Sequence, residues 1–108
     1  MPRYISELTL STKAIDGMIK NPQDRGEAVR PLFEALGGSL VEYYFAVGQG
    51  KVIVIYELPD ADSIQALSLR VIAGGTTTDF STTRIITSAE AVEGIKMAGD
   101  IDYRPPTS

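Results

Sequence analysis

The 108-residue sequence predicts an α+β domain in which four strands form one antiparallel sheet. Three observations lead to this expectation. Residues 40–47 and 51–58 are rich in β-branched and aromatic side chains and flank Gly48-Gln49-Gly50, a pattern typical of a β-hairpin. The part of the chain before the hairpin turn and the part after it follow the same order, which is strand, helix, strand. Each main helical segment also ends in a Gly-Gly pair followed by a strand, at Gly37 and at Gly74.

The first half of the chain begins with a strand and a helix. Residues 3–10 have the apolar and aromatic content of a strand. Ser11 or Thr12 then offers a hydroxyl that can cap the first turn of a helix. Asn21-Pro22 stops or bends that helix, because proline lacks an amide proton and disfavours helical angles in the residue before it.

A second helical piece is predicted after this break. Its apolar residues recur with helical spacing and place one apolar face on the helix: Val29, Leu32, Phe33 and Leu36. Pro31 lies inside this pattern. It either kinks the helix or occupies the first turn of a short helix that starts near Ala28.

The second half repeats the order strand, helix, strand and adds a last helix. Residues 52–56 are apolar on both pleat faces, so both faces of this strand are expected to be covered. Asp60 is the expected cap of a helix with Ile64, Leu67 and Val71 on its buried face. Residues 76–86 are rich in threonine and isoleucine and predict the fourth strand.

The last helix is expected to begin at the cap residue Ser88 and to end at Gly99, with Val92 and Ile95 facing inward. The expected domain therefore spans residues 1–99. Residues 100–108 contain Pro-Pro and no apolar period, which predicts an extended or disordered tail.

The order βαββαβ is that of the ferredoxin-like fold. It predicts the strand order 4-1-3-2, with both helices on one face of the sheet. The other face would then expose apolar side chains of the second and third strands, which is a large patch for a monomer. We therefore expect a homodimer or a higher homo-oligomer in which two sheets pack face to face.

Composition excludes several classes of function. The chain has no cysteine and no histidine, which removes disulfides, thiolate nucleophiles and most zinc and haem sites, so we expect no metal and no cofactor. A net charge of -4 without a basic stripe argues against a nucleic-acid partner. No apolar run is long enough to cross a bilayer and no signal peptide is visible at the start, which predicts a cytoplasmic protein with no membrane partner.

Several blocks of sequence resemble the GYD domain proteins of the dimeric α/β barrel superfamily. The blocks are PRYI at residue 2, Asn21-Pro22 with Arg25, EALGGSL at residue 34, YYFAVG at residue 43, VIVIYELPD at residue 52, and TTR at residue 82. The resemblance covers most of residues 2–98 and implies the ferredoxin-like fold and the dimer. At the hairpin turn, where the family carries Gly-Tyr-Asp, this chain has Gly50 in place of the tyrosine and Lys51 in place of the aspartate.

Candidate ligand-binding residues gather at one end of the predicted sheet. With the strand order 4-1-3-2, Tyr4, Tyr56 and Arg84 would meet at one edge, near Arg3 and Glu57. Two phenols and a guanidinium suit a carboxylate or an enolate oxygen, with Tyr56 and Arg84 as candidate catalytic groups. The alternative is structural, with tyrosine hydroxyls in water at the rim of the core and Arg84 paired with an acid.

Three further residues have open roles. Tyr43 and Tyr44 point to opposite faces of the second strand, so one should face the helices and the other a dimer partner. Packing would explain both tyrosines, although Tyr44 is also a candidate ligand contact. Asp79 allows three interpretations: a polar residue at the end of the fourth strand, a hydrogen-bond acceptor between subunits, or a general base whose pKa is raised by burial.

The sequence therefore favours a small-molecule-binding or assembly module. The alternative is a cofactor-independent monooxygenase or isomerase, which the wider superfamily includes, with a small organic substrate in a pocket between sheet and helices. Whether the protein is an enzyme depends on whether buried polar groups converge inside each protomer.

Overall fold

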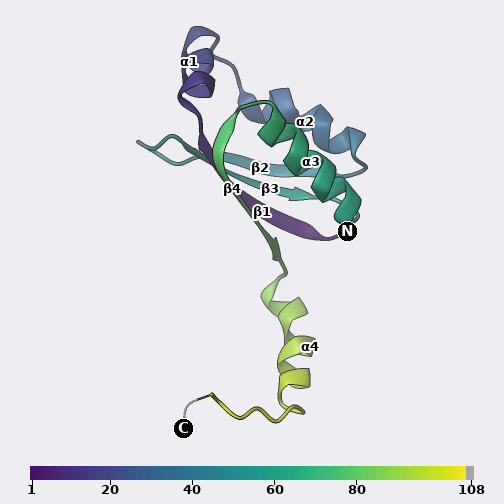
Figure 1. Cartoon of the computed structure of the whole chain (residues 1–108). Coiled ribbons are helices and arrows are strands. Elements are labelled where there is room, and N and C mark those ends of the chain that lie inside the picture. The colour runs from purple at the N-terminus through teal and green to yellow at the C-terminus, as the bar shows by residue number, and fades with distance from the viewer. Residues whose placement is uncertain (107–108) are drawn as a thin grey trace.

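A four-stranded antiparallel sheet forms the body of the protein (Figure 1). The structure is a computed structural model that describes residues 1–106. Its elements follow the chain as β1 (Arg3–Leu10), α1 (Thr12–Lys20), α2 (Arg25–Ala35), β2 (Ser39–Phe45), β3 (Lys51–Glu57), α3 (Ala61–Ala73), β4 (Thr77–Ile85) and α4 (Ser88–Ala98). The strand order is β2-β3-β1-β4, which is the predicted order 4-1-3-2 read from the opposite edge. The predicted α+β, ferredoxin-like arrangement is confirmed.

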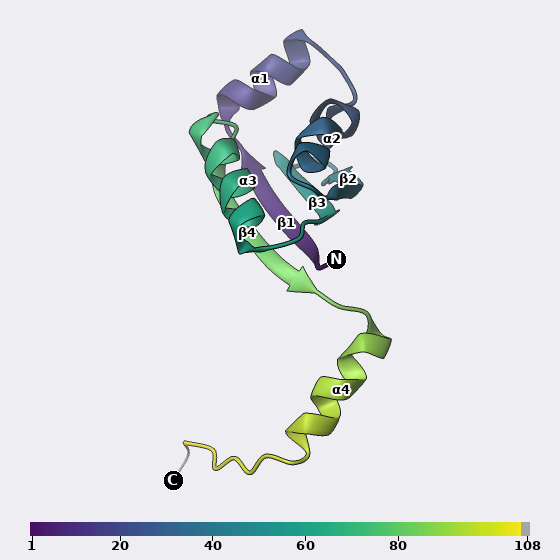
Figure 2. The ribbon, with the colours of Figure 1, turned by 90° about the vertical axis from the view of Figure 1, so that its right-hand side faces the viewer.

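The core lies between one face of the sheet and the helices α2 and α3. Figures 1 and 2 show both helices on the same side of the sheet. Burial alternates strictly along β3, where Val52, Val54 and Tyr56 face the helices and the residues between them are only half-buried. Phe33 of α2 and Leu67 of α3 pack onto these side chains. This alternation shows that the protomer itself covers only one face of β3.

The opposite face of the sheet carries apolar side chains that no described helix covers. Strand register places Ile5 beside Ile55, and Tyr44 beside Ile53. Ion pairs border these isoleucines, Arg3 with Glu57 at 3.0 Å and Lys51 with Glu7 at 3.4 Å. This surface, defined by Ile5, Ile53, Ile55, Ile85 and Tyr44, is called the open face below.

The helix α2 begins earlier than the sequence indicated. Asp24 is its N-cap, because the carboxylate accepts a hydrogen bond from the amide of Glu27 at 3.1 Å. Of the two alternatives for Pro31, the short helix that starts near Ala28 is therefore wrong, and Pro31 lies inside the helix. A capped first turn stabilises the start of the helix, whereas Pro31 removes one amide donor from its interior.

The connection between α2 and β2 depends on a glycine that no other residue can replace without movement. A Cβ atom on Gly38 would lie 1.9 Å from the carbonyl oxygen of Glu57. The start of β2 can approach the end of β3 this closely only because Gly38 has no side chain.

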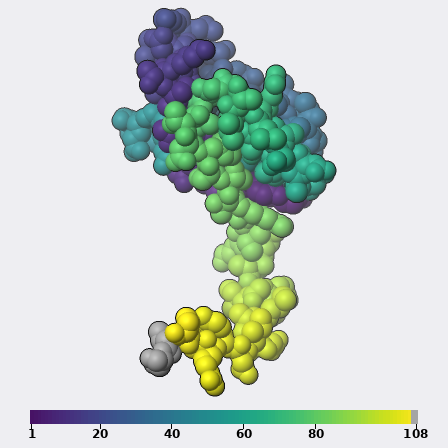
Figure 3. Space-filling view, in the orientation of Figure 1, coloured from purple at the N-terminus to yellow at the C-terminus, as the bar shows by residue number. Residues whose placement is uncertain are grey.

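The helix α4 stands apart from the sheet (Figures 1 and 3). Its N-cap is Thr87 rather than the expected Ser88, because Thr87 and Glu90 exchange hydrogen bonds in a capping box. Val92 and Ile95 are 43% and 67% exposed, so the expectation that they face inward is wrong. The helical period identified the apolar face correctly, but α4 leaves the end of β4 and points away from the core.

Residues 100–105 follow α4 without a helix or strand, and residues 107–108 of the predicted tail lie outside the described part of the chain. Within residues 1–106, no helix combines the length and the apolar character that a membrane crossing requires.

Candidate functional site

A cavity of about 100 Å³ lies inside the protomer, between the sheet and the two helices that cover it. Side chains from all four strands and from α2 and α3 line it. Its walls are mainly apolar, with Val29, Leu32, Phe33, Leu67, Val71 and Phe80 among the lining residues. The cavity is therefore mainly apolar inside, with a few polar side chains in its wall.

A row of three hydroxyl groups lies beside this cavity, and two of the residues that carry them, Ser6 and Tyr56, line it. The hydroxyl of Tyr56 lies 2.8 Å from Oγ of Ser6, and Oγ of Ser6 lies 2.8 Å from Oγ1 of Thr82. Ser6 and Tyr56 are almost fully buried, at 2% and 1% exposure. The strand register brings these groups together. Ser6 pairs with Thr82 across β1 and β4, and Tyr4, two residues before Ser6, pairs with Tyr56 across β1 and β3. Each hydroxyl can both donate and accept, so the row can adjust its hydrogen bonds to a ligand.

The guanidinium of Arg25 and the phenol of Tyr43 also line the cavity. Nε of Arg25 is buried and has no hydrogen-bond partner among the described residues. Burial raises the pKa of Tyr43, while the charge of Arg25 and a hydrogen bond from that guanidinium to the phenol act in the opposite direction. Tyr43 therefore remains a neutral phenol at neutral pH and can donate a hydrogen bond.

A glycine lets α2 start close to β2 at this point. Gly26 is buried, and a Cβ atom added to it would lie 3.1 Å from Cβ of Tyr43. The neighbouring residue, Arg25, is thereby brought to the sheet at the first turn of the helix.

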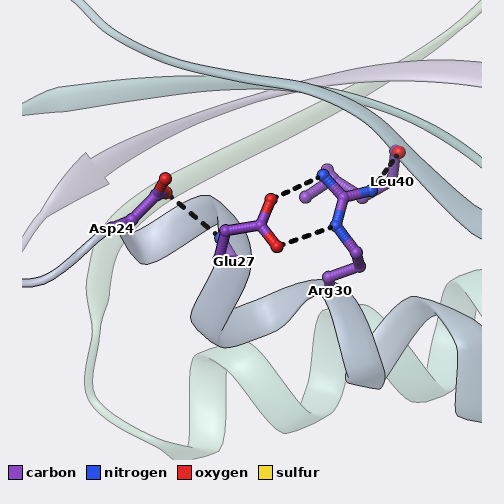
Figure 4. A network of polar contacts seen from close by, with 4 residues as sticks. All are labelled: Asp24, Glu27, Arg30 and Leu40. Carbon is purple, nitrogen blue, oxygen red and sulfur yellow. Dashed lines mark hydrogen bonds and ion pairs between the residues drawn. The ribbon is translucent and has the colours of Figure 1, made fainter.

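A polar network fixes this end of α2 (Figure 4). Arg30 donates to both carboxylate oxygens of Glu27, and its Nη1 donates to the carbonyl oxygen of Leu40 at 3.1 Å. The β2–β3 register shifts between Leu40 and Glu42, which is where a bulge leaves backbone groups without a ladder partner. Arg30 thus ties α2 to the irregular part of β2 and holds the first turn of the helix in place.

Two of the sequence-predicted site residues, Tyr4 and Tyr56, come together, and Tyr56 lines the cavity. Tyr4 and Tyr56 are paired across β1 and β3, and their rings stack with centroids 5.8 Å apart. The structural alternative, in which the hydroxyl of Tyr56 lies in water, is wrong, because that hydroxyl is buried against Ser6.

Arg84 is opposite Tyr4 in the register, but its side chain is exposed and lines a different hollow. That hollow, of about 540 Å³, lies at the end of the sheet beside the start of α4, and Arg3, Glu57 and Glu90 also line it. None of the ion pairs among residues 1–106 includes Arg84. Although this hollow is the larger one, we favour the inner cavity as the site, because packed core residues hold its walls and α4 stands apart from the sheet.

Tyr44 and Asp79 lie away from the cavity. Tyr43 faces the helices and Tyr44 the open face, as expected for neighbouring residues of a strand. Asp79 pairs with Thr9 on the open-face side of the sheet, is exposed, and accepts a hydrogen bond from the amide of Phe80 at 3.1 Å. An exposed carboxylate lacks the burial that would favour a general base at this position.

The sequence reasoning missed Ser6, Thr82 and the role of Arg25. Ser6 carried a signal, because it interrupts the apolar alternation of Tyr4, Leu8 and Leu10 on the face that packs against the helices. A small hydroxyl at a core position of a strand indicates a buried hydrogen-bond partner. Arg25 carried a weaker signal, because it stands beside a glycine at a helix start.

The described residues contain no cluster of three or more carboxylate, histidine or cysteine side chains that could hold a metal ion. The polar groups of the cavity are hydroxyls, a phenol and a guanidinium. These groups suit an oxygen-bearing organic ligand.

Comparisons with known proteins agree with this architecture. Residues 4–95 match the family model described as the GYD domain. Two solved structures are similar, each with a TM-score of 0.50 and each covering 82% of this chain. Protein Atu4242 from Agrobacterium tumefaciens is 19% identical over 94% of its own chain, and an uncharacterized NIPSNAP domain protein from Burkholderia xenovorans is 12% identical over 96% of its chain. At these identities the two structures support the fold alone, and no curated protein matches the sequence significantly. Because the family model spans most of the sequence, this chain belongs to the GYD domain family.

Proposed function

We propose that this protein is a homodimeric module that binds a small organic molecule in the cavity between the sheet and the helices α2 and α3. The observation that carries the proposal is the row of hydroxyls of Thr82, Ser6 and Tyr56 beside a mainly apolar cavity. Ligand sites in proteins combine apolar walls with a few well-placed polar groups in the same way.

An enzymatic role is the second candidate, because buried polar groups do converge inside the protomer. A cofactor-independent monooxygenase or isomerase would need a group that accepts a proton from its substrate. No carboxylate is among the residues that line the cavity in the described part of the chain. The raised pKa of Tyr43 makes this phenol a donor at neutral pH. Binding is therefore the better-supported function.

The open face supports the dimer. Four strands of about eight residues, spaced about 4.8 Å apart, present roughly 500 Å². A stable interface buries about 800 Å² on each partner. The apolar face of α4 and the tail after it would supply the remaining area, since Ile95, Met97 and Ile101 are each about two-thirds exposed in the protomer. A second copy would cover both surfaces at once.

Native mass spectrometry of the protein purified from its own host tests the binding function. We expect a small molecule that remains bound in gentle conditions and is released on denaturation. The substitution Val71→Phe fills the cavity and should remove this molecule. Val47→Phe is the matched control, because Val47 is 96% exposed in the hairpin turn and lies outside the cavity. Equal retention by both variants would place the ligand elsewhere.

A further inference from the structure

The cavity has a cationic side chain, Arg25, for which the described residues supply no anion. Arg25 lines the cavity, and its Nε is buried without a hydrogen-bond partner among residues 1–106. None of the ion pairs among those residues includes Arg25. The carboxylate of the adjacent Asp24 is engaged in capping α2. A guanidinium keeps its charge in proteins, and leaving it partly buried without an anion is unfavourable.

Resting on the proposed binding function, we infer that the cavity takes a short-chain organic acid whose carboxylate pairs with Arg25. The planar guanidinium presents parallel donors that match the two oxygens of a carboxylate. Tyr43, the other polar group at this end of the cavity, is positioned with Arg25 by the close approach at Gly26. The carboxylate would then supply the anion that the guanidinium lacks and an acceptor for its Nε.

The volume of the cavity indicates how large an alkyl body it can hold. A water molecule occupies about 30 Å³ of the liquid, and an apolar cavity of about 150 Å³ holds benzene. A cavity of about 100 Å³ therefore accommodates a body of about three to five carbon atoms. Larger substrates of drug size need about 300 Å³ or more.

The walls distinguish an organic acid from an inorganic anion. Val29, Leu67, Val71 and Phe80 line the cavity and offer no hydrogen bonds from their side chains. Phosphate or sulfate has no apolar part to place against these side chains, and burying its charged oxygens there is unfavourable. The alkyl body of a carboxylic acid instead gains from contact with them.

The test follows the Nε–Hε resonance of Arg25 by nuclear magnetic resonance while sodium butyrate is titrated into the intact protein. Sodium chloride at equal concentration corrects for ionic strength, and butyramide provides a neutral molecule of the same shape. Sodium phosphate provides the inorganic anion. We expect a saturable shift with butyrate, and at least tenfold weaker binding of both butyramide and phosphate.

Substitutions separate the charge from the cavity. Arg25→Met keeps the length of the side chain and removes its charge, so it should abolish butyrate binding, followed here by the amide resonance of Phe80. Arg70→Met is the matched control, because Arg70 is exposed in the last turn of α3 and does not line the cavity. Its butyrate affinity should be unchanged.

The outcomes distinguish this inference from the proposed function. If butyramide binds as tightly as butyrate and Arg25→Met has no effect, the cavity binds small molecules but the assignment to organic acids is wrong. If phosphate binds as tightly as butyrate, the site is a general anion site and the inference is overturned. If none of the three compounds shifts the resonances of residues that line the cavity and Val71→Phe retains the host-derived molecule, both the inference and the proposed function fail.

Discussion

The hydroxyl oxygen of Tyr56 lies 2.8 Å from Oγ of Ser6 in the interior of the fold, and both side chains are almost fully buried. Tyr56 also contacts Phe33 of α2, with ring centroids 5.1 Å apart. This hydrogen bond therefore links the two central strands at the place where α2 packs on them, and it forms part of the candidate site.

The pair of hydroxyls is expected to be coupled energetically. Ser6→Ala leaves the hydroxyls of Tyr56 and Thr82 without this partner, which should lower the free energy of unfolding by about 1–3 kcal/mol. Tyr56→Phe removes the other partner and should cost about 1 kcal/mol. Urea unfolding of the double variant checks the coupling, because the double variant should lose less than the sum of the single changes. Strictly additive losses would contradict a buried hydrogen bond between these residues.

Gly38→Ala should be strongly destabilising. The added Cβ would lie 1.9 Å from the carbonyl oxygen of Glu57, and backbone atoms must move to accommodate it. We expect a loss of about 1–3 kcal/mol or more in the free energy of unfolding. Gly17→Ala is the matched control in α1, where no atom apart from the neighbouring backbone of the same helix lies within 4 Å of the added Cβ. That substitution should stabilise the protein by about 0.5–1 kcal/mol, because alanine favours the helix.

The N-cap of α3 makes stability depend on pH in the acidic range. Hydrogen bonds from Ser63 hold the pKa of Asp60 below its ordinary value. The folded pKa is thus lower than the unfolded one, so this stabilisation is present above about pH 4 and is lost as the pH falls through the folded pKa. Asp60→Asn should be less stable than wild type at pH 7 and should approach it at pH 3. Urea midpoints at both pH values measure this difference, with Asp102→Asn in the tail as a control that should show none.

A charge on the open face should prevent dimerisation. Ile55 lies on this face, between Ile5 of β1 and Glu42 of β2. Light scattering of the wild type should give twice the protomer mass of 11.6 kDa, whereas Ile55→Lys should give the protomer mass itself. Ile19→Lys, on an exposed position of α1, should remain dimeric. A wild-type mass of 11.6 kDa at micromolar concentration would show that the sheets do not pack face to face.

Removal of residues 88–108 should weaken the dimer without unfolding the domain. Val92, Ile95 and Met97 of α4 are 43%, 67% and 64% exposed, so the core does not depend on them. We expect the amide spectrum of β1 to β4 to be retained and the dimer dissociation constant to rise at least tenfold. Both can be measured on the same truncated sample. Unchanged dimerisation would show that the sheets alone supply the interface.

Much of the fold was predictable because local pattern and topology agree. Periodicity and capping residues identified β1 and α3 closely, and the repeated order strand, helix, strand gave the sheet order. The position of α4 was not predictable in the same way. The period of Val92 and Ile95 reports which face of a helix is apolar, but it carries no information on which surface covers that face.

The candidate site was predictable only in part. Strand order placed Tyr4 beside Tyr56, and the structure brings their rings together. The same strand order placed Arg84 near Tyr4 but could not show that its side chain is exposed at the edge of the sheet. Arg25 was overlooked because its importance arises from burial beside β2, which depends on how closely α2 approaches the sheet at Gly26.

The central position of β1 constrains the order in which the newly synthesised chain can fold. β1 leaves the ribosome first, yet its partner β3 begins at Lys51 and its partner β4 begins at Thr77. The two strands of the β2–β3 hairpin can pair as soon as they emerge. The edge of β1 that pairs with β4 stays unpaired until β4 has been synthesised. At about 5–20 residues per second, this wait is on the order of 4–15 seconds. During that time the amides and carbonyls along one edge of β1 remain without their partners in the sheet, and this unpaired edge is open to pairing with another chain.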